Sequence, residues 1–232
     1  YMKNYICFGF FLLVYACANI VAPVGGPKDV SPPELITAIP NNKSVNFNTT
    51  IITLVFNEYI QIKNKANIRI SPLCEPPPKI NIKGKKLELE IFCPLDSTIT
   101  YTINFGKSIL DINEGNVLEN FKYVFSKGHQ LDSLIIQGGV QELYSGNPAG
   151  GALIGLYKNF NNLDSLLPYY YTFTNLDGSF TIENIKQSEY TILAILDQNN
   201  NFKYNQGEMI SMPEVFSDLD INKNLGLFQQ KL

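Results

Sequence analysis

The sequence predicts an all-β protein made of two tandem β-sandwich domains. Short runs rich in Ile, Val, Tyr, Phe and Thr alternate along the chain with clusters of Gly, Pro, Asn and Asp, the pattern of many short strands joined by turns. No stretch shows a sustained helical period in its apolar residues, which disfavours an α-helical domain. The 232 residues suffice for one large domain or two small ones.

The first domain is expected over residues 33–127. Its density of short apolar runs is that of an immunoglobulin-like sandwich. Apolar and polar residues alternate most clearly around one hairpin, where Ile80 and Ile82 precede a turn and Leu87 and Leu89 follow it. One face of this hairpin should therefore be buried and the other exposed to solvent. The predicted strands are 44–47, 51–56, 67–71, 79–83, 86–92, 100–105 and 121–126.

The same hairpin predicts a disulfide. If Lys83 and Gly84 are its two turn residues, Cys74 and Cys93 face each other across the strands. In an exported protein such a bridge persists, and in the chain-entropy model a loop of this length adds about 3 kcal/mol of stability. The prolines at 76–78 interrupt the ladder and could shift its register. Two free, buried thiols are the alternative.

The second domain is expected over residues 131–228. It contains a strand ending in Gly-x-Val, a Pro and a small residue before the next apolar strand, and a Thr-x-x-Asp-Gly-x-Phe hairpin. In these features it resembles the carboxypeptidase regulatory-like, transthyretin-like domains, which implies a second, non-catalytic β-sandwich. The matching residues are Gly139, Pro148, Ala152, Thr174, Asp177, Gly178, Phe180 and Tyr190.

An apolar run extends from Tyr5 to Ala18, near the start of the given sequence. As a helix it would extend only about 21 Å, short of the roughly 30 Å core of a bilayer, which favours a signal peptide. Its end, Val14-Tyr15-Ala16-Cys17, resembles the lipobox of bacterial lipoproteins. This resemblance implies a signal peptide over 1–16 and an acylated Cys17 that holds the protein on a membrane. A buried N-terminal helix with an incidental cysteine is the alternative.

The residues after Cys17 bear on sorting. Residues 17–32 are rich in Pro and Gly and are expected to form a semi-rigid tether. Position 18 is not the Asp that would retain a lipoprotein of this kind in the inner membrane, so the outer membrane is expected. No acidic run follows Cys17, and the periplasmic and the cell-surface side both stay open.

Four stretches together give a resemblance that covers nearly the whole chain. They are "GGPKD" after the lipobox, "FNEYIQI" (56–62), "TYTINFGKSILDINEGN" (100–116) and "FKYVFSKG" (121–128). With them the chain resembles the SbsA-type Ig-like domain lipoproteins of Bacteroidota. The resemblance implies an envelope lipoprotein with binding or scaffolding β-domains.

Composition disfavours two classes of function. The net charge is −3, and the 18 basic residues, with Arg69 the only arginine, are spread along the chain, whereas nucleic-acid binding needs clustered positive charge. His129 is the only histidine and lies in the linker between the domains, so neither a histidine triad nor a multi-histidine zinc site can form. We therefore predict a protein that is not an enzyme; a hydrolase acting on glycans or peptides is the less favoured alternative.

One loop has the spacing of a calcium site. In a twelve-residue loop that begins at Asp197 and ends at Glu208, oxygen ligands fall at the positions used to wrap Ca²⁺. Phe202 stands where such loops have Gly, and the alternative is an Asn-rich loop whose side chains bond their own backbone. The candidate ligands are Asp197, Asn199, Asn201, Lys203 (through its carbonyl), Asn205 and Glu208.

Two further stretches contain polar or aromatic side chains of the kinds found in binding sites. "DINEGN" (111–116) is better explained by turns in which Asp and Asn side chains bond the backbone. "LLPYYYTF" (166–173) places Tyr169, Tyr171 and Phe173 on one face of a strand, and at least one face of that strand should be core.

The function expected from these features is a lipid-anchored binding or scaffold module of the outer membrane, such as an accessory subunit of an outer-membrane complex. Its partners would be the membrane, through Cys17, and an envelope protein or polysaccharide. An adhesin or polysaccharide-binding surface protein is the alternative.

Overall fold

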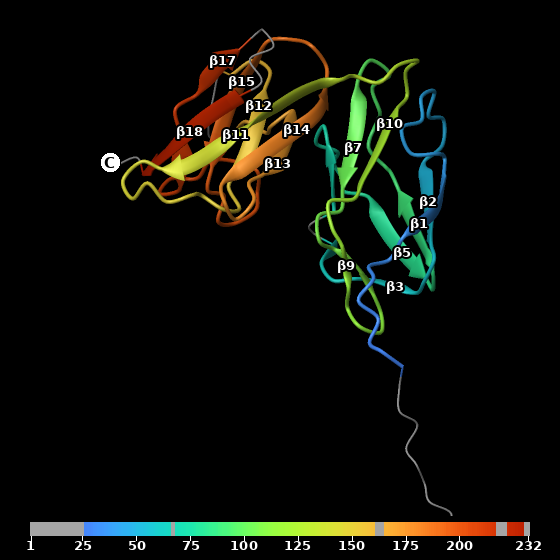
Figure 1. Cartoon of the computed structure of the whole chain (residues 1–232). Helices are drawn as coiled ribbons and strands as arrows, with labels where there is room; N and C mark the ends of the chain where they lie inside the picture. Colours follow the sequence, from blue (N-terminus) through green and yellow to red (C-terminus); the bar gives the residue numbers. More distant parts are fainter. Residues whose placement is uncertain (1–25, 66–67, 161–164, 217–221, 230–232) are drawn as a thin grey trace, which may run out of the picture.

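The computed structural model describes residues 26–65, 68–160, 165–216 and 222–229, and these residues form two β-domains (Figure 1). Strands, and no α-helix, make up the regular structure of this described part. No helix that is long and apolar enough to span a membrane occurs within it. The predicted all-β class is therefore confirmed.

The first domain is a two-layered sandwich (right in Figure 1). Its strands are β1 (Leu35–Ile39), β2 (Ile51–Phe56), β3 (Ile60–Ile62), β4 (Arg69–Ser71), β5 (Lys79–Lys83), β6 (Lys86–Glu90), β7 (Thr100–Asn104), β8 (Ile109–Asp111), β9 (Val117–Leu118) and β10 (Lys122–Ser126). One layer has the order β1-β2-β6-β5 and the other the order β10-β7-β4. A small sheet, β3-β8-β9, lies at the lower end of the domain in Figure 1.

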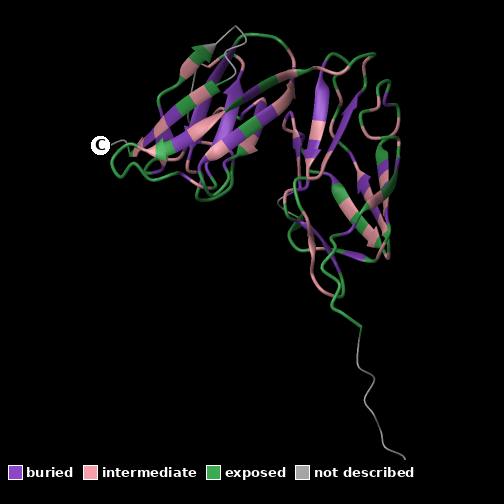
Figure 2. Cartoon of the chain, viewed as in Figure 1, coloured by how far each residue is buried: buried purple, intermediate pink, exposed green. Residues whose placement is uncertain are grey.

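Alternating apolar residues build the core between these layers. In β2, Ile52, Leu54 and Phe56 are buried while Ile51 is exposed, because successive side chains of a strand point to opposite faces. Figure 2 shows this banding along the strands of both domains. The facing layer contributes aromatic side chains such as Phe125, which is fully buried.

The hairpin of β5 and β6 has a different register from the predicted one. Lys83 pairs with Lys86, so the turn residues are Gly84 and Lys85 and not Lys83 and Gly84. Gly84 has a φ of +64°, and glycine readily takes such a φ at the first position of a two-residue hairpin turn. The predicted turn has the glycine at its second position, so every predicted pair along the ladder is displaced from the observed one.

Other strand predictions also need correction. Residues 44–47 do not form a strand; Ser44 makes a single parallel bridge to Phe125. The predicted list omitted β1, β3, β8 and β9. In β1, Ile36 and Ile39 are exposed, so this edge strand lacks the regular alternation that identifies strands in a sequence.

The second domain is formed by β11–β18 (left in Figure 1). Its strands are β11 (Leu134–Glu142), β12 (Leu153–Tyr157), β13 (Tyr170–Phe173), β14 (Ser179–Ile185), β15 (Tyr190–Ile195), β16 (Met209–Ser211), β17 (Glu214–Phe216) and β18 (Asn222–Gln229). The sheet order is β13-β12-β15-β16-β18-β11-β14, with β17 beside β15. Residues from both ends of this order, among them Phe180 and Ile154, pack into one core, so the sheet folds over itself.

The turn between β13 and β14 forms as the sequence indicated. Gly178 has a φ of +77° and its N–H donates to the carbonyl of Asn175 at 2.9 Å. After the turn, Phe180 and Ile182 are buried on the core face. Just before it, the buried hydroxyl of Thr174 accepts from the N–H of Ala152 at 2.8 Å, which ties the hairpin to the start of β12.

We predict that Gly178→Ala strongly destabilises the second domain. A Cβ at this position would lie 2.4 Å from the carbonyl oxygen of Val140 and would have to adopt the positive φ. The left-handed backbone costs about 1–2 kcal/mol and the overpacking about 1–3 kcal/mol more. Gly146→Ala is the matched control, because Gly146 also has a positive φ but nothing lies within 4 Å of its added Cβ. Urea unfolding measures both, and equal losses would contradict the prediction.

Candidate functional site

The two domains meet where β4 of the first lies beside β13 of the second. The N–H of Tyr171 donates to the Ser71 hydroxyl at 3.1 Å, and the N–H of Leu73 donates to the carbonyl of Tyr169 at 3.1 Å. Both strands end their own sheets, and the open edge of a sheet carries unpaired backbone groups. Each domain therefore covers part of the other's sheet edge.

A second set of contacts joins β14 to the first domain. The ammonium of Lys122 pairs with the carboxylate of Glu183 at 2.5 Å, and the side-chain amide of Asn184 donates to the Thr102 hydroxyl at 2.9 Å. The side chains of the ion pair are only 30% and 36% exposed, so water screens their attraction less than that of a fully exposed pair. Together with the β4–β13 contact, they fix the domains on two sides.

The linker between the domains is also tied down. The N–H of Thr100 donates to the carboxylate of Asp132 at 2.9 Å, and the N–H of Asp132 donates to the Thr100 hydroxyl at 2.7 Å. Thr100 is fully buried, so this reciprocal pair anchors the start of the second domain on β7. His129 is exposed in this linker.

Arg69 lies over an aromatic ring of the second domain. Its guanidinium carbon lies 4.9 Å from the centre of the Phe202 ring. Phe202 is buried and meets Tyr171 edge to face, with 5.0 Å between the ring centres. A cation stacked on an aromatic ring contributes about 0.5–2 kcal/mol. The only arginine of the sequence is thus used at the domain junction.

The Asn-rich loop 197–208 holds Phe202 in this position. The Asp197 carboxylate accepts from the N–H of Phe202 at 2.8 Å and from that of Asn201 at 3.3 Å. The Glu208 carboxylate accepts from the N–H of Asn205 at 2.8 Å. Phe202, at the position where calcium loops have Gly, has a φ of +64°.

The predicted calcium ligands therefore come together in one loop and bond its backbone. Asn199 Oδ1 accepts from the N–H of Asn201 at 3.0 Å, and Asn201 Oδ1 accepts from that of Lys203 at 2.8 Å. In the part of the chain that the structure describes, no three His, Cys, Asp or Glu side chains gather to hold a metal. Backbone bonding accounts for the loop without a cation. Since a carboxylate has about four acceptor sites, calcium binding stays a prediction.

The six-residue candidate at 111–116 is a turn of the expected kind. Asp111 is fully buried, and its carboxylate accepts from the N–H groups of Glu114, Gly115 and Asn116 at 2.6–2.8 Å. Burial alone would raise the pKa of Asp111, but these N–H groups outweigh it and hold the pKa below its usual range. The carboxylate thus stabilises the fold at neutral pH, and that contribution is lost as the pH falls through the folded-state pKa.

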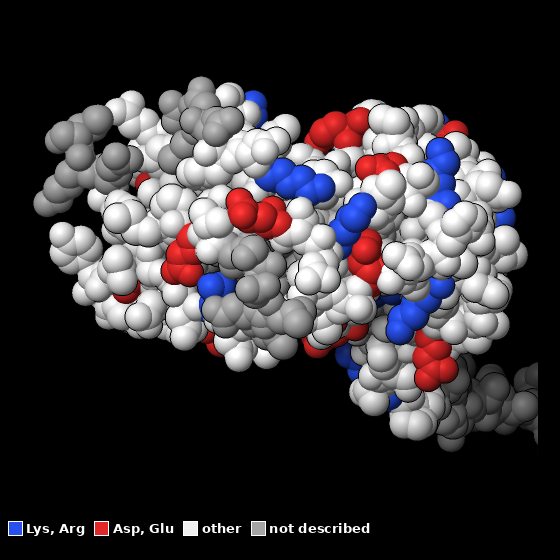
Figure 3. Space-filling view, turned by 90° about the horizontal axis from the view of Figure 1, so that it is seen from above, with Lys and Arg blue, Asp and Glu red and all other residues white. Residues whose placement is uncertain are grey.

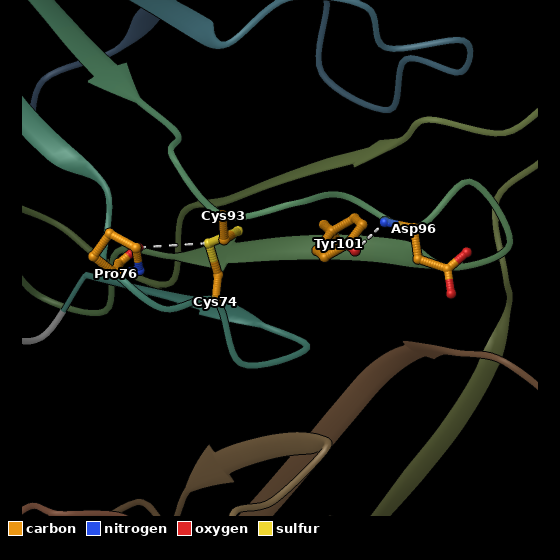
Figure 4. The surroundings of a disulfide bond; sticks show 5 residues. All are labelled: Cys74, Pro76, Cys93, Asp96 and Tyr101. Atoms are coloured by element: carbon orange, nitrogen blue, oxygen red, sulfur yellow. Dashed lines mark hydrogen bonds between the residues drawn. A yellow bond between two sulfur atoms is a disulfide. The ribbon is translucent and has the colours of Figure 1, made fainter.

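Cys74 and Cys93 form a disulfide with 5.6 Å between their Cα atoms (Figure 4). The two cysteines do not face each other within the β5–β6 ladder, because that ladder ends at Lys79 and Glu90. Cys74 lies in the connection from β4, in one layer, to β5, in the other, and Cys93 follows β6. The bridge therefore ties together the chain where it crosses between layers, and the predicted cross-strand geometry was wrong.

The other predicted cysteine, Cys17, lies outside the described residues, as does the whole signal-peptide stretch 1–16. The acylation of Cys17 stays a prediction.

Within the tyrosine-rich segment 166–173, strand β13 carries two buried tyrosines, which are buried for different reasons. Tyr170 belongs to the core of the second domain, whereas Tyr171 is buried with Phe202 and Leu73 at the domain junction. Phe173 is 36% exposed. Sequence reasoning found the two faces of this strand but missed that the first domain covers one of them.

Beside the junction lies a cleft of about 510 Å³ between the domains. Its walls are the outer face of β4, β7 and β10 on one side and β13 and β14 on the other, with Arg69 and Phe173 among the lining residues. The sequence carried no signal for it, because the two walls belong to different domains. Figure 3 shows acidic and basic side chains in small mixed groups on the face in view, without an extended basic patch.

Comparisons with known proteins bear on the first domain. Residues 29–127 match the family model of the bacterial Ig-like domain, so the predicted Ig-like fold of this domain is confirmed. No curated protein matches the sequence. The SbsA type and the lipoprotein class stay predictions.

Three solved structures are among those that match the chain. The major pilin subunit BcpA of Bacillus cereus is 12% identical, with 86% of this chain and 70% of that chain covered and a TM-score of 0.29. The N-terminal part of the bacterial S-layer protein SbsC is 11% identical, with 80% and 43% covered and a TM-score of 0.31. The pilus adhesin RrgA of Streptococcus pneumoniae is 12% identical, with 79% and 33% covered and a TM-score of 0.24. The chain thus spans less than half of the last two structures.

We predict that Asp197→Ala destabilises the second domain by about 1–3 kcal/mol, because it leaves the buried N–H of Phe202 without its acceptor. Asn199→Ala is the control, since Asn199 is exposed and accepts a single bond from Asn201; it should cost less than about 1 kcal/mol. Urea unfolding in EDTA measures both. Equal effects would show that Asp197 does not hold Phe202.

Proposed function

We propose that this protein is a non-catalytic, lipid-anchored binding or scaffold module of the bacterial outer membrane. The observation that carries the proposal is the domain junction. Hydrogen bonds between β4 and β13, the Lys122–Glu183 ion pair and the contact of Arg69 with the Phe202 ring join two β-domains that a bare linker would leave free to move. A joined pair presents one fixed surface to a partner, which suits binding or scaffolding.

The proposed anchor is an acylated Cys17. The lipobox-like Val14-Tyr15-Ala16-Cys17 and the Pro- and Gly-rich residues 17–32 support it, because acyl chains on the cysteine would hold the protein on a leaflet and the tether would raise the domains above it. The proposed partners are an envelope protein or a polysaccharide. Weak calcium binding by the loop 197–208 is a further part of this proposal.

We predict that Cys17→Ser abolishes the anchor. In cells labelled with a fatty-acid probe, the wild-type protein should carry the label and sediment with outer membranes, and the variant should do neither. Cys7→Ser is the matched control, since Cys7 lies in the expected signal peptide and its loss should leave both readouts unchanged. An unlabelled wild-type protein that still retains residues 1–16 in its mass spectrum would refute the anchor.

The binding role has its own test, which is affinity capture of the tagged, acylated protein from native membranes. A scaffold or accessory subunit should retain an outer-membrane protein at near one-to-one stoichiometry. A surface polysaccharide retained in place of a protein would favour the alternative of a saccharide-binding surface protein. Recovery of the protein alone from both crosslinked and native membranes would contradict a binding or scaffold role.

A further inference from the structure

One polar wall of the interdomain cleft is formed by a row of paired residues in the first domain's sheet. Arg69, Asn104 and Lys122 are direct register partners across β4, β7 and β10, so their side chains lie side by side on the same face. All three line the cleft. Because neighbouring strands are about 4.8 Å apart, the two cations flank the amide of Asn104 at a spacing of about 10 Å.

Two polar groups of this cleft have no protein partner. The Arg69 guanidinium and the Asn104 NH₂ have no hydrogen-bond acceptor among the described residues, since Asn104 uses only its Oδ1, toward the N–H of Gly106. Both residues are only partly buried, so their donors are accessible to a ligand in the cleft.

The charge of the cleft favours an acidic group on that ligand. Arg69, Lys107 and Lys122 line it, and Glu183 is the only acidic lining residue that the structure describes. Lys122 is paired with Glu183 and Lys107 with Glu119, which leaves Arg69 as the one lining cation without an ion pair among the described residues. Its guanidinium carbon lies over the Phe202 ring. A guanidinium fork binds a carboxylate through two parallel hydrogen bonds.

The rest of the lining favours a ligand rich in hydroxyl groups. Ligand pockets are usually lined mainly by apolar side chains, but here Ser, Thr and Asn predominate, including Thr172, Asn175 and Thr181. The half-exposed ring of Phe173 offers an apolar face on which the C–H face of a sugar ring can stack. The volume of about 510 Å³ is within the usual range of ligand sites.

We propose that this cleft binds an acidic saccharide, with the carboxylate on Arg69 and Asn104 and a sugar face on Phe173. This rests on the binding role proposed above and names its ligand. It does not depend on the lipid anchor.

The test is isothermal titration calorimetry of the full chain in detergent, with trigalacturonate and 3′-sialyllactose as acidic probes and with maltotriose and tri-glutamate for comparison. At least one acidic saccharide should bind more tightly than both comparison ligands. Arg69→Gln should weaken that binding about tenfold or more, as expected for loss of a charge-assisted pair. Lys79→Gln removes an equal charge from the exposed edge strand β5 and should leave the affinity unchanged.

Phe173→Ala gives an independent comparison from the opposite wall, because it removes the ring on which the sugar face is proposed to stack. It should weaken binding roughly two- to tenfold, the range of one aromatic contact. Phe92→Ala is its matched control, since Phe92 is an exposed phenylalanine that does not line the cleft. Thermal unfolding of each variant establishes that it is folded.

The outcomes separate the two proposals. Failure of both acidic saccharides to bind, equal binding of maltotriose, tighter binding of tri-glutamate or an unchanged affinity in Phe173→Ala would each overturn the saccharide site. None of these results affects the labelling of Cys17 or capture of a membrane partner, on which the proposed function is tested.

Discussion

The pairing of the chain around Tyr169 and Tyr171 with that around Ser71 and Leu73 is the constraint on which the arrangement of the domains depends. It joins two sheet edges whose backbone groups would otherwise face water or another chain. Once this edge is fixed, Glu183 and Asn184 of β14 come within reach of Lys122 and Thr102. The cleft lies beside these contacts and would not keep its shape without them.

The junction also explains why the Asn-rich loop is built as it is. A phenylalanine at a positive φ is strained, and the loop offsets this strain with carboxylate and amide oxygens that accept from its own N–H groups. The result is a buried ring that stands under the guanidinium of Arg69. The spacing that resembles a calcium loop is therefore also the spacing that a compact, self-bonded loop requires.

Within the first domain, the disulfide holds the two layers together, as the junction holds the two domains together. Cys74 lies where the chain passes from one layer to the other, so the bridge restrains a crossover and not a hairpin. The segment after Cys93 is held as well, since the N–H of Asp96 donates to the hydroxyl of Tyr101 at 2.8 Å (Figure 4). The face of β4 that lines the cleft thus belongs to a covalently supported sandwich.

The sequence by itself determined the all-β class, the Asp177–Gly178 turn and most of the longer strands, because alternation and turn chemistry are local properties of neighbouring residues. It did not determine the hairpin register, which moved when Gly84 took the first turn position, or the short strands β3, β8 and β9, which are defined by their partners. Only the tertiary structure decided that one face of the tyrosine strand packs on the first domain and that Arg69, Asn104 and Tyr171 share a cleft. These residues lie far apart in the sequence, and only the meeting of two sheet edges, which no local pattern encodes, brings them together.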